Sequence, residues 1–174
     1  MGRADGRVGR RELQITTMQT GYELFVRRWA WLFPLTFLCH ILEEYYGGFH
    51  HWIARVIGAE LSPLQFLNLN AMFWIVMTVG ITAAMLVPLC RWLAAIFAVT
   101  VTLNATLHLI GSVVTMTYSP GAVTGTILWL PLGTYTLFLA YKHFTRVQFA
   151  AFIIVGIILH LMVLMLAFNA SRAQ

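Results

Sequence analysis

Three ionisable residues in one short segment have the types and the spacing that chemistry requires: His40, Glu43 and Glu44. At about 100° per residue on a helix, His40 and Glu44 lie about 40° apart, and Glu43 falls about 60° to the other side of His40. Imidazoles and carboxylates are the usual protein ligands of zinc and non-haem iron. His40 and Glu44, one helical turn apart, are therefore expected to chelate a divalent metal, zinc or non-haem iron.

A second polar group recurs every four residues further along the chain, at Thr100, Asn104, His108 and Ser112. On a helix this spacing forms one stripe, and His108 would complete a three-ligand set with His40 and Glu44. The set leaves a position open for water, on which Glu43 would act as general base. Without metal, the same groups would still permit acid/base chemistry.

Further residues are expected to support this site: Asn104, Tyr118, Pro120, Gly121, Asn68 and His160. Asn68 and Asn70 point about 200° apart on a helix, so at most one of them should face the site. His160 is best interpreted as a donor in an inter-helix hydrogen bond, and asparagines commonly join helices inside membrane bundles.

The elements that position these residues are membrane-spanning helices. Of the 174 residues 60% are hydrophobic and 10% are charged, against about 25% charged in soluble domains. The fold class is all-α, a polytopic transmembrane bundle of about five spans that forms a single domain over residues 24–170. The predicted spans are residues 29–46, 63–87, 92–114, 122–141 and 147–168. An amphipathic segment at 49–58 is expected to lie along the interface, and residues 1–20 are predicted to be a disordered basic cytoplasmic tail.

Basic residues set the expected orientation. The net charge is +5, and six of the eleven Lys and Arg precede the first apolar block. A cytoplasmic N-terminus puts nine basic residues inside and two outside, so the C-terminus is expected outside. This distribution favours a multi-pass protein of a cell membrane, most simply a bacterial inner membrane, with membrane lipid as partner. No soluble domain remains to offer a nucleic-acid surface, so we expect no nucleic-acid partner.

Depth estimates bring the polar residues into one layer. At 1.5 Å per residue from the cytoplasmic end of each span, His40, Glu43, Glu44, His108 and His160 all lie about 17–24 Å up. The layer therefore falls in the outer half of the bilayer. Ionisable groups at such depths are costly and mark functional sites by default.

The segment His40-Ile41-Leu42-Glu43-Glu44 resembles the motif that names the HXXEE-domain family of membrane proteins. That family is also marked by a further histidine, for which His108 is the natural candidate, and by a Y-x-P-G motif, which Tyr118-Ser119-Pro120-Gly121 matches. The resemblance covers roughly residues 29–141. The family is one of unknown function, so the resemblance supports the site and implies no reaction.

Intramembrane proteases of the CAAX-processing type also use a paired-Glu helix, in the pattern E-E-x-x-x-R. Here Gly48 stands where the arginine would be, which argues against membership.

The leading hypothesis is a metal-dependent, hydrolase-like enzyme acting on a lipid or membrane-embedded substrate in the outer leaflet. The alternatives are a non-enzymatic ligand- or ion-binding, transporter-like protein or complex subunit, and a metal-free acid/base lipid isomerase.

Overall fold

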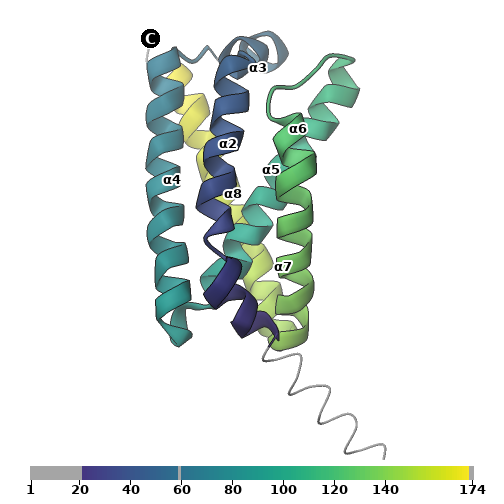
Figure 1. Ribbon diagram of the computed structural model, residues 1–174. Coiled ribbons are helices and arrows are strands. Elements are labelled where there is room, and N and C mark those ends of the chain that lie inside the picture. The colour runs from purple at the N-terminus through teal and green to yellow at the C-terminus, as the bar shows by residue number, and fades with distance from the viewer. Residues whose placement is uncertain (1–20, 59, 173–174) are drawn as a thin grey trace, which may run out of the picture.

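Helices account for the secondary structure of the part of the chain that the computed structural model describes, residues 21–58 and 60–172. The predicted tail 1–20 lies outside the described residues. After a helical segment at 21–29 come α2 (Leu32–Tyr46), α3 (Phe49–Ile57), α4 (Pro63–Leu86), η1 (Pro88–Cys90), α5 (Trp92–Thr115), α6 (Ala122–Thr124), η2 (Gly125–Trp129), α7 (Leu130–His143) and α8 (Arg146–Arg172). They form one up-and-down bundle, with α5 and α8 crossing behind α2 and α7 (Figure 1).

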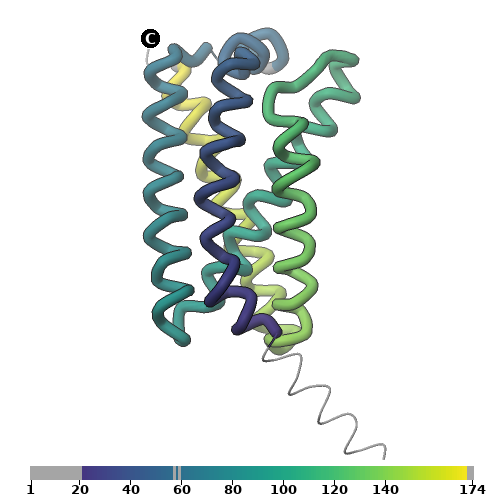
Figure 2. Tube along the Cα trace, viewed as in Figure 1, coloured from purple at the N-terminus to yellow at the C-terminus, as the bar shows by residue number. Residues whose placement is uncertain are grey.

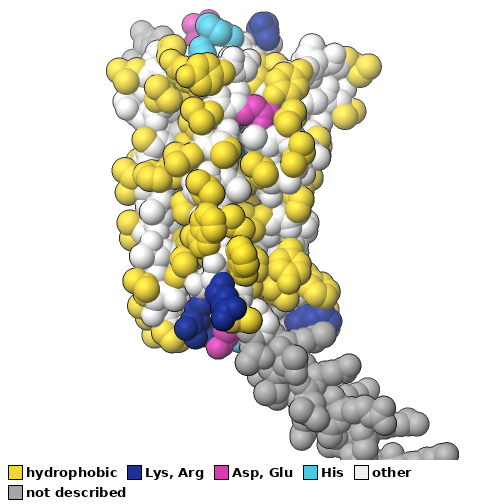
Figure 3. All heavy atoms as spheres, viewed as in Figure 1, with side chains coloured by type: hydrophobic (Ala, Val, Ile, Leu, Met, Phe, Trp, Pro, Cys, Tyr) yellow, Lys and Arg dark blue, Asp and Glu magenta, His cyan; other side chains and the backbone are white. Residues whose placement is uncertain are grey.

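Four of the described helical stretches are long and apolar enough to cross a membrane: Pro63–Leu86, Pro88–Thr115, Ala122–His143 and Arg146–Ser171. In an 18-residue window of the last stretch the mean hydropathy is 2.8 and 11% of the residues are buried inside the bundle, so its side chains mostly face outward. Apolar side chains cover the visible side of the bundle between its two ends (Figure 3). An all-α transmembrane bundle is therefore confirmed.

The first predicted span differs in detail from the structure. It was expected as one helix over 29–46, but the helix is interrupted at 30–31 and restarts as α2, which has 15 residues. A span needs about 20 residues, so α2 alone is too short for one, and the segment at 21–29 continues it toward the lower end (Figure 2). The other four predicted spans match α4, α5, the 122–143 stretch and α8 within a few residues.

Helix α5 is the centre of the bundle. It has ten buried residues among its 24 and packs against α4, α7 and α8. Small residues allow this close packing: a Cβ added to Gly133 of α7 or Gly156 of α8 would meet α5 atoms at 2.2 and 2.5 Å. Helices in membranes associate through such close approach of backbones. The polar stripe of α5 is consequently held in the interior.

Local sequence signals explain where the helices begin. Ser62 accepts a hydrogen bond from Gln65 N, while the Gln65 side chain accepts one from Ser62 N, so a capping box starts α4. Pro131 has no N–H to donate into the preceding turn, and that turn, Gly125–Trp129, is a π-helix. The wider turn lies where Trp129 packs into the interior.

Most of the basic residues that the structure describes lie at one end of the bundle (Figure 3). Arg27, Arg28, Lys142 and Arg146 are exposed, and the Lys and Arg side chains gather mainly at the lower end (Figure 3). Arg91, in the turn between α4 and α5, lies 2.7 Å from Glu23 in an ion pair. The two cysteines, Cys39 and Cys90, are unpaired.

Candidate metal centre

The structure brings His40, Glu44 and His108 together at the end of the bundle that carries α3. Glu44 Oε1 lies 3.5 Å from His40 Nε2 and 3.1 Å from His108 Nε2. One ligand atom from each of the three residues lies within 4.8 Å of the other two. The residues are 1%, 4% and 5% exposed. This cluster, hereafter the triad, is thus a closed, converging set of donor atoms that could hold a metal ion.

The spacing within the triad suits a small divalent ion. Ligand bonds of about 2.0–2.1 Å arranged tetrahedrally put neighbouring ligand atoms about 3.3 Å apart. The two observed separations, 3.1 and 3.5 Å, lie on either side of that value. His40 Nε2 is also buried without a hydrogen-bond partner among the described residues. Three protein ligands leave the fourth tetrahedral position open, which is the pattern of catalytic rather than structural zinc sites.

The ring of His40 is fixed on both sides. Its Nδ1 lies 2.8 Å from Thr124 Oγ1, and its face stacks on Trp129 with ring centroids 3.8 Å apart. An Nδ1–H that donates to the threonine hydroxyl leaves the lone pair of Nε2 directed at Glu44. Hydrogen bonds to the second ring nitrogen orient metal-ligating histidines in this way.

His108 is held by a small ring of serines. Its Nδ1 lies 3.0 Å from Ser119 Oγ. The backbone N–H of Ser119 donates to Ser112 Oγ at 3.0 Å, and the Ser112 hydroxyl donates back to the carbonyl of His108 at 2.9 Å. The turn after α5 is thereby fastened to the same helix face that carries His108, and Nε2 of His108 is again the nitrogen left for the triad.

Glu43 points away from the triad. Its Oε1 accepts hydrogen bonds from Gly121 N and Val123 N, both at 3.0 Å, and from the Tyr118 hydroxyl, while Oε2 accepts from Thr124 N at 2.6 Å. These N–H groups begin the helix at 122–143 and have no intrahelical partners. A carboxylate there also meets the positive end of the helix dipole. Glu43 therefore caps this helix from α2, and its accepting positions are taken.

The Y-x-P-G segment closes the triad. Gly121 has a φ of +102°, and a Cβ at this position would lie 2.7 Å from His108 Cε1 and 2.9 Å from His40 Cε1. Pro120 is buried, and a Cβ on Gly47 would meet its ring at 2.7 Å. Gly121 is thus required both by its backbone conformation and by the two imidazoles that it touches.

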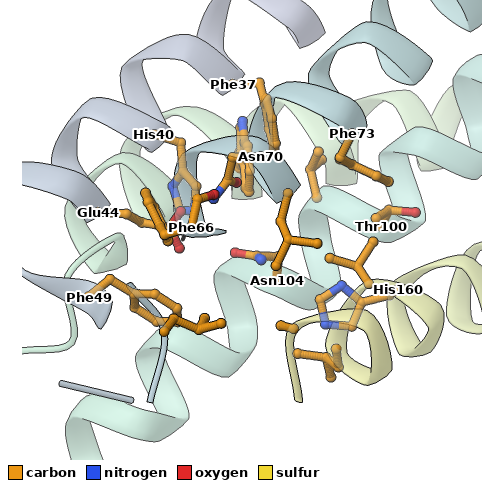
Figure 4. A pocket seen from close by; sticks show the side chains of 17 residues that line it. Phe37, His40, Glu44, Phe49, Phe66, Asn70, Phe73, Thr100, Asn104 and His160 are labelled. Carbon is orange, nitrogen blue, oxygen red and sulfur yellow. Dashed lines mark hydrogen bonds and ion pairs between the residues drawn. The ribbon is translucent and has the colours of Figure 1, made fainter. Parts of the chain in front are cut away.

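A pocket extends from the triad into the bundle between α2, α4, α5 and α8, with a cavity volume of about 100 Å³ (Figure 4). Asn104 and His160, both predicted to support the site, line it. Of the two asparagines on α4, Asn70 lines the pocket and Asn68 is exposed. His160 differs from the inter-helix donor that we expected, because its buried Nε2 has no hydrogen-bond partner among the described residues. Tyr118 is half exposed and acts through Glu43.

Sequence reasoning missed three residues of the site, Thr124, Ser119 and Trp129, and left open whether Asn68 or Asn70 faces the pocket. Ser119 is the variable position of Y-x-P-G. The turn that follows α5 brings this residue back toward His108, so the sequence could have indicated its hydrogen bond to that histidine. Thr124 and Trp129 carry no local signal, since they are brought to His40 by the packing of the 122–143 helix against α2.

Comparison with known families agrees with this geometry. The family described as "Protein of unknown function with HXXEE motif" matches residues 31–136. The chain belongs to the HXXEE family. Neither a curated protein nor a solved structure matches it.

In this HXXEE protein the residues of the motif have two different roles. The histidine and the second glutamate, His40 and Glu44, enter the triad, whereas the first glutamate, Glu43, caps the 122–143 helix. The matched region runs from the break before α2 into α7 and so includes the whole triad. Helix α8, which brings His160 to the pocket, lies outside it.

Proposed function

We propose that this HXXEE protein is a metal-dependent, hydrolase-like membrane enzyme whose centre is the triad of His40, Glu44 and His108. The observation that carries the proposal is the convergence of two imidazole nitrogens on one buried carboxylate oxygen, at 3.1 and 3.5 Å. Two neutral ligands and one anion leave a divalent ion with a net positive charge. Such an ion lowers the pKa of a bound water and polarises a carbonyl oxygen.

The residues around the triad would prepare it for that ion. Thr124 and Ser119 fix the two imidazoles so that each offers Nε2, which reduces the reorganisation needed on binding. Trp129 and Phe49 pack against the rings of His40 and His108, with centroids 3.8 and 5.3 Å apart. These apolar walls exclude bulk water and strengthen the electrostatic interactions within the site.

Glu43, expected from the sequence to be the general base, takes a positioning role in this proposal. It holds the start of the 122–143 helix, and with it Gly121 and Thr124, against the triad. No second carboxylate is among the described residues lining the pocket beside Glu44. Glu44 therefore combines metal binding with proton acceptance.

The substrate is proposed to be a lipid or another membrane-inserted molecule. The pocket that leads to the triad is lined mainly by aromatic and aliphatic side chains, as in most small-molecule sites. With the basic end of the bundle in the cytoplasm, as the positive-inside rule requires, the triad lies in the outer half of a cell membrane.

A metal-free acid/base enzyme is the second candidate, favoured by one distance. His108 Nε2 lies 3.1 Å from Glu44 Oε1, so the two can share a proton directly without an ion. A carrier would require a polar path toward the basic end, but α5 buries only apolar side chains over residues 94–99. That observation disfavours a transport role.

Elemental analysis of detergent-purified protein separates these candidates. We expect about one equivalent of zinc or iron in the wild type and its loss in both His40→Ala and His108→Ala. His51→Ala is the matched control, because His51 is exposed on α3. Metal absent from folded wild type after supplementation would refute the metal centre and leave the acid/base enzyme.

A further inference from the structure

A second polar group lies in the pocket beyond the triad. His160 of α8 is 4% exposed, and its Nε2 has no hydrogen-bond partner among the described residues. Asn104 Oδ1 of α5 is likewise buried and without one. Both residues line the same pocket as His40 and Glu44 (Figure 4). Leaving a buried polar atom unpaired costs about 1–3 kcal/mol, so two such atoms in one cavity indicate a ligand that pairs with them.

The other polar side chains of the pocket offer both acceptors and donors. Asn70 donates one Nδ2 hydrogen to Phe66 O at 3.1 Å, which leaves its Oδ1 and its second N–H. Thr100 uses its hydroxyl hydrogen on Ile96 O at 3.1 Å, which leaves the lone pairs of Oγ1. Together with the amide of Asn104, the pocket offers three acceptor oxygens, amide N–H donors and one imidazole nitrogen. A hydroxyl group, which both donates and accepts a hydrogen bond, fits this set.

The charge of the residues that line the pocket narrows the class of ligand further. No Lys or Arg is among the described residues that line the pocket, whereas the carboxylate of Glu44 does line it. A phosphate or carboxylate headgroup would bring a second anion beside Glu44, with no Lys or Arg among the described lining residues to pair with it and at the cost of its own desolvation. Anionic phospholipids and ionised fatty acids are therefore disfavoured in this part of the pocket.

The pocket also reaches the outer surface of the bundle beside α8. Leu164 lines the pocket and is 46% exposed, and α8 is the most outward-facing of the described spans. A cavity of about 100 Å³ accommodates a headgroup and a short stretch of chain, while the rest of an acyl or alkyl chain would continue into lipid past Leu164.

We infer that the pocket takes an uncharged, hydroxyl-bearing amphiphile, whose hydroxyl group is bound by Asn104 and His160. The inference rests on the proposed function for the triad as the reacting end of the site. It adds the chemical class of the substrate: a neutral lipid that carries a free hydroxyl group, as opposed to a charged phospholipid.

The test uses three photoreactive probes that share one diazirine-bearing ten-carbon chain and differ in the headgroup: alcohol, carboxylate or phosphate. Each is crosslinked to full-length protein in detergent, with unlabelled decan-1-ol as competitor, and the labelled peptides are mapped. We expect saturable labelling of α5 and α8 by the alcohol. In Asn104→Leu and in His160→Leu this labelling should fall at least about tenfold, and in the matched control Asn68→Leu, on the exposed face of α4, it should not change.

Equal labelling by all three headgroups, or labelling that neither pocket variant reduces, would overturn the inference. The metal content of each sample, measured in parallel, keeps this result separate from the proposed function. Alcohol-selective labelling of metal-free wild type would support the pocket inference while the metal centre fails. A bound metal without any headgroup preference would support the metal centre and overturn the pocket inference.

Discussion

Replacing Gly121 by alanine tests whether the Y-x-P-G turn exists to give the two imidazoles room. The added Cβ would lie 2.7 Å from His108 Cε1, 2.8 Å from His108 Nε2 and 2.9 Å from His40 Cε1, at a φ of +102°. The backbone strain costs about 1–3 kcal/mol, and overpacking against the rings costs about 1–3 kcal/mol more. Because the Gly121 backbone is held by Glu43, the added methyl group would displace the two rings against their own contacts, and the triad would open.

The expected result is weaker metal binding out of proportion to any loss of folding. If about 2 kcal/mol of the cost falls on the triad, zinc affinity drops roughly thirtyfold. Competition with a fluorescent zinc chelator in detergent measures this, alongside thermal unfolding. Gly58→Ala is the matched control, since Gly58 has a φ of +69° but no atom within 4 Å of an added Cβ. Zinc affinity that is the same in the two variants would refute the steric argument.

Three further outcomes follow from the contacts around the triad. Ser119→Ala and Thr124→Ala each remove the hydroxyl that orients one imidazole. Each should weaken metal binding about 10–100-fold in the same competition assay. Unchanged affinity would show that the rings are held by packing alone. Glu43→Ala removes the hydrogen-bond acceptor of three backbone N–H groups. Limited proteolysis should therefore cut the 118–121 turn faster than in wild type. Equal cutting rates would contradict the capping role. Burial, followed by the hydrogen bond to Glu43 and its charge, raises the pKa of Tyr118 to about 12; the neutral phenol's contribution to stability is then fully present below pH 10 and lost as pH rises through about 12. The difference in 295 nm absorbance between wild type and Tyr118→Phe should follow that pKa, and a midpoint near 10 would show that the Tyr118–Glu43 contact is absent in solution.

The sequence predicts the bundle well because long apolar blocks leave few alternatives. Spans and caps follow from local rules, as the Ser62–Gln65 capping box shows. The triad was also accessible, because His40 and Glu44 are one turn apart and His108 lies at a similar depth. These are regularities of single helices, which sequence spacing describes directly.

What sequence spacing could not reveal depends on how helices pack. Glu43 and Glu44 are adjacent, and nothing local distinguishes the one that joins the triad from the one that caps another helix. That division is made by the 122–143 helix, whose N–H groups arrive from 78–81 residues away. Likewise, whether Asn68 or Asn70 faces inward depends on the rotation of α4 against α2 and α8.

The contact between Glu43 and Thr124 has a consequence for biogenesis. The carboxylates on α2 enter the membrane long before the residues that satisfy them, since Thr124 is 81 residues further along the chain. At about 5–20 residues per second, translation of that interval takes on the order of 4–16 s. During this time α2 carries two acidic groups that lipid does not tolerate well. Helix α2 is therefore expected to stay near the insertion machinery or the water interface, and to settle only when the 122–143 helix arrives. Nascent chains that end before residue 124 should accordingly be recognised as unfinished by membrane quality control.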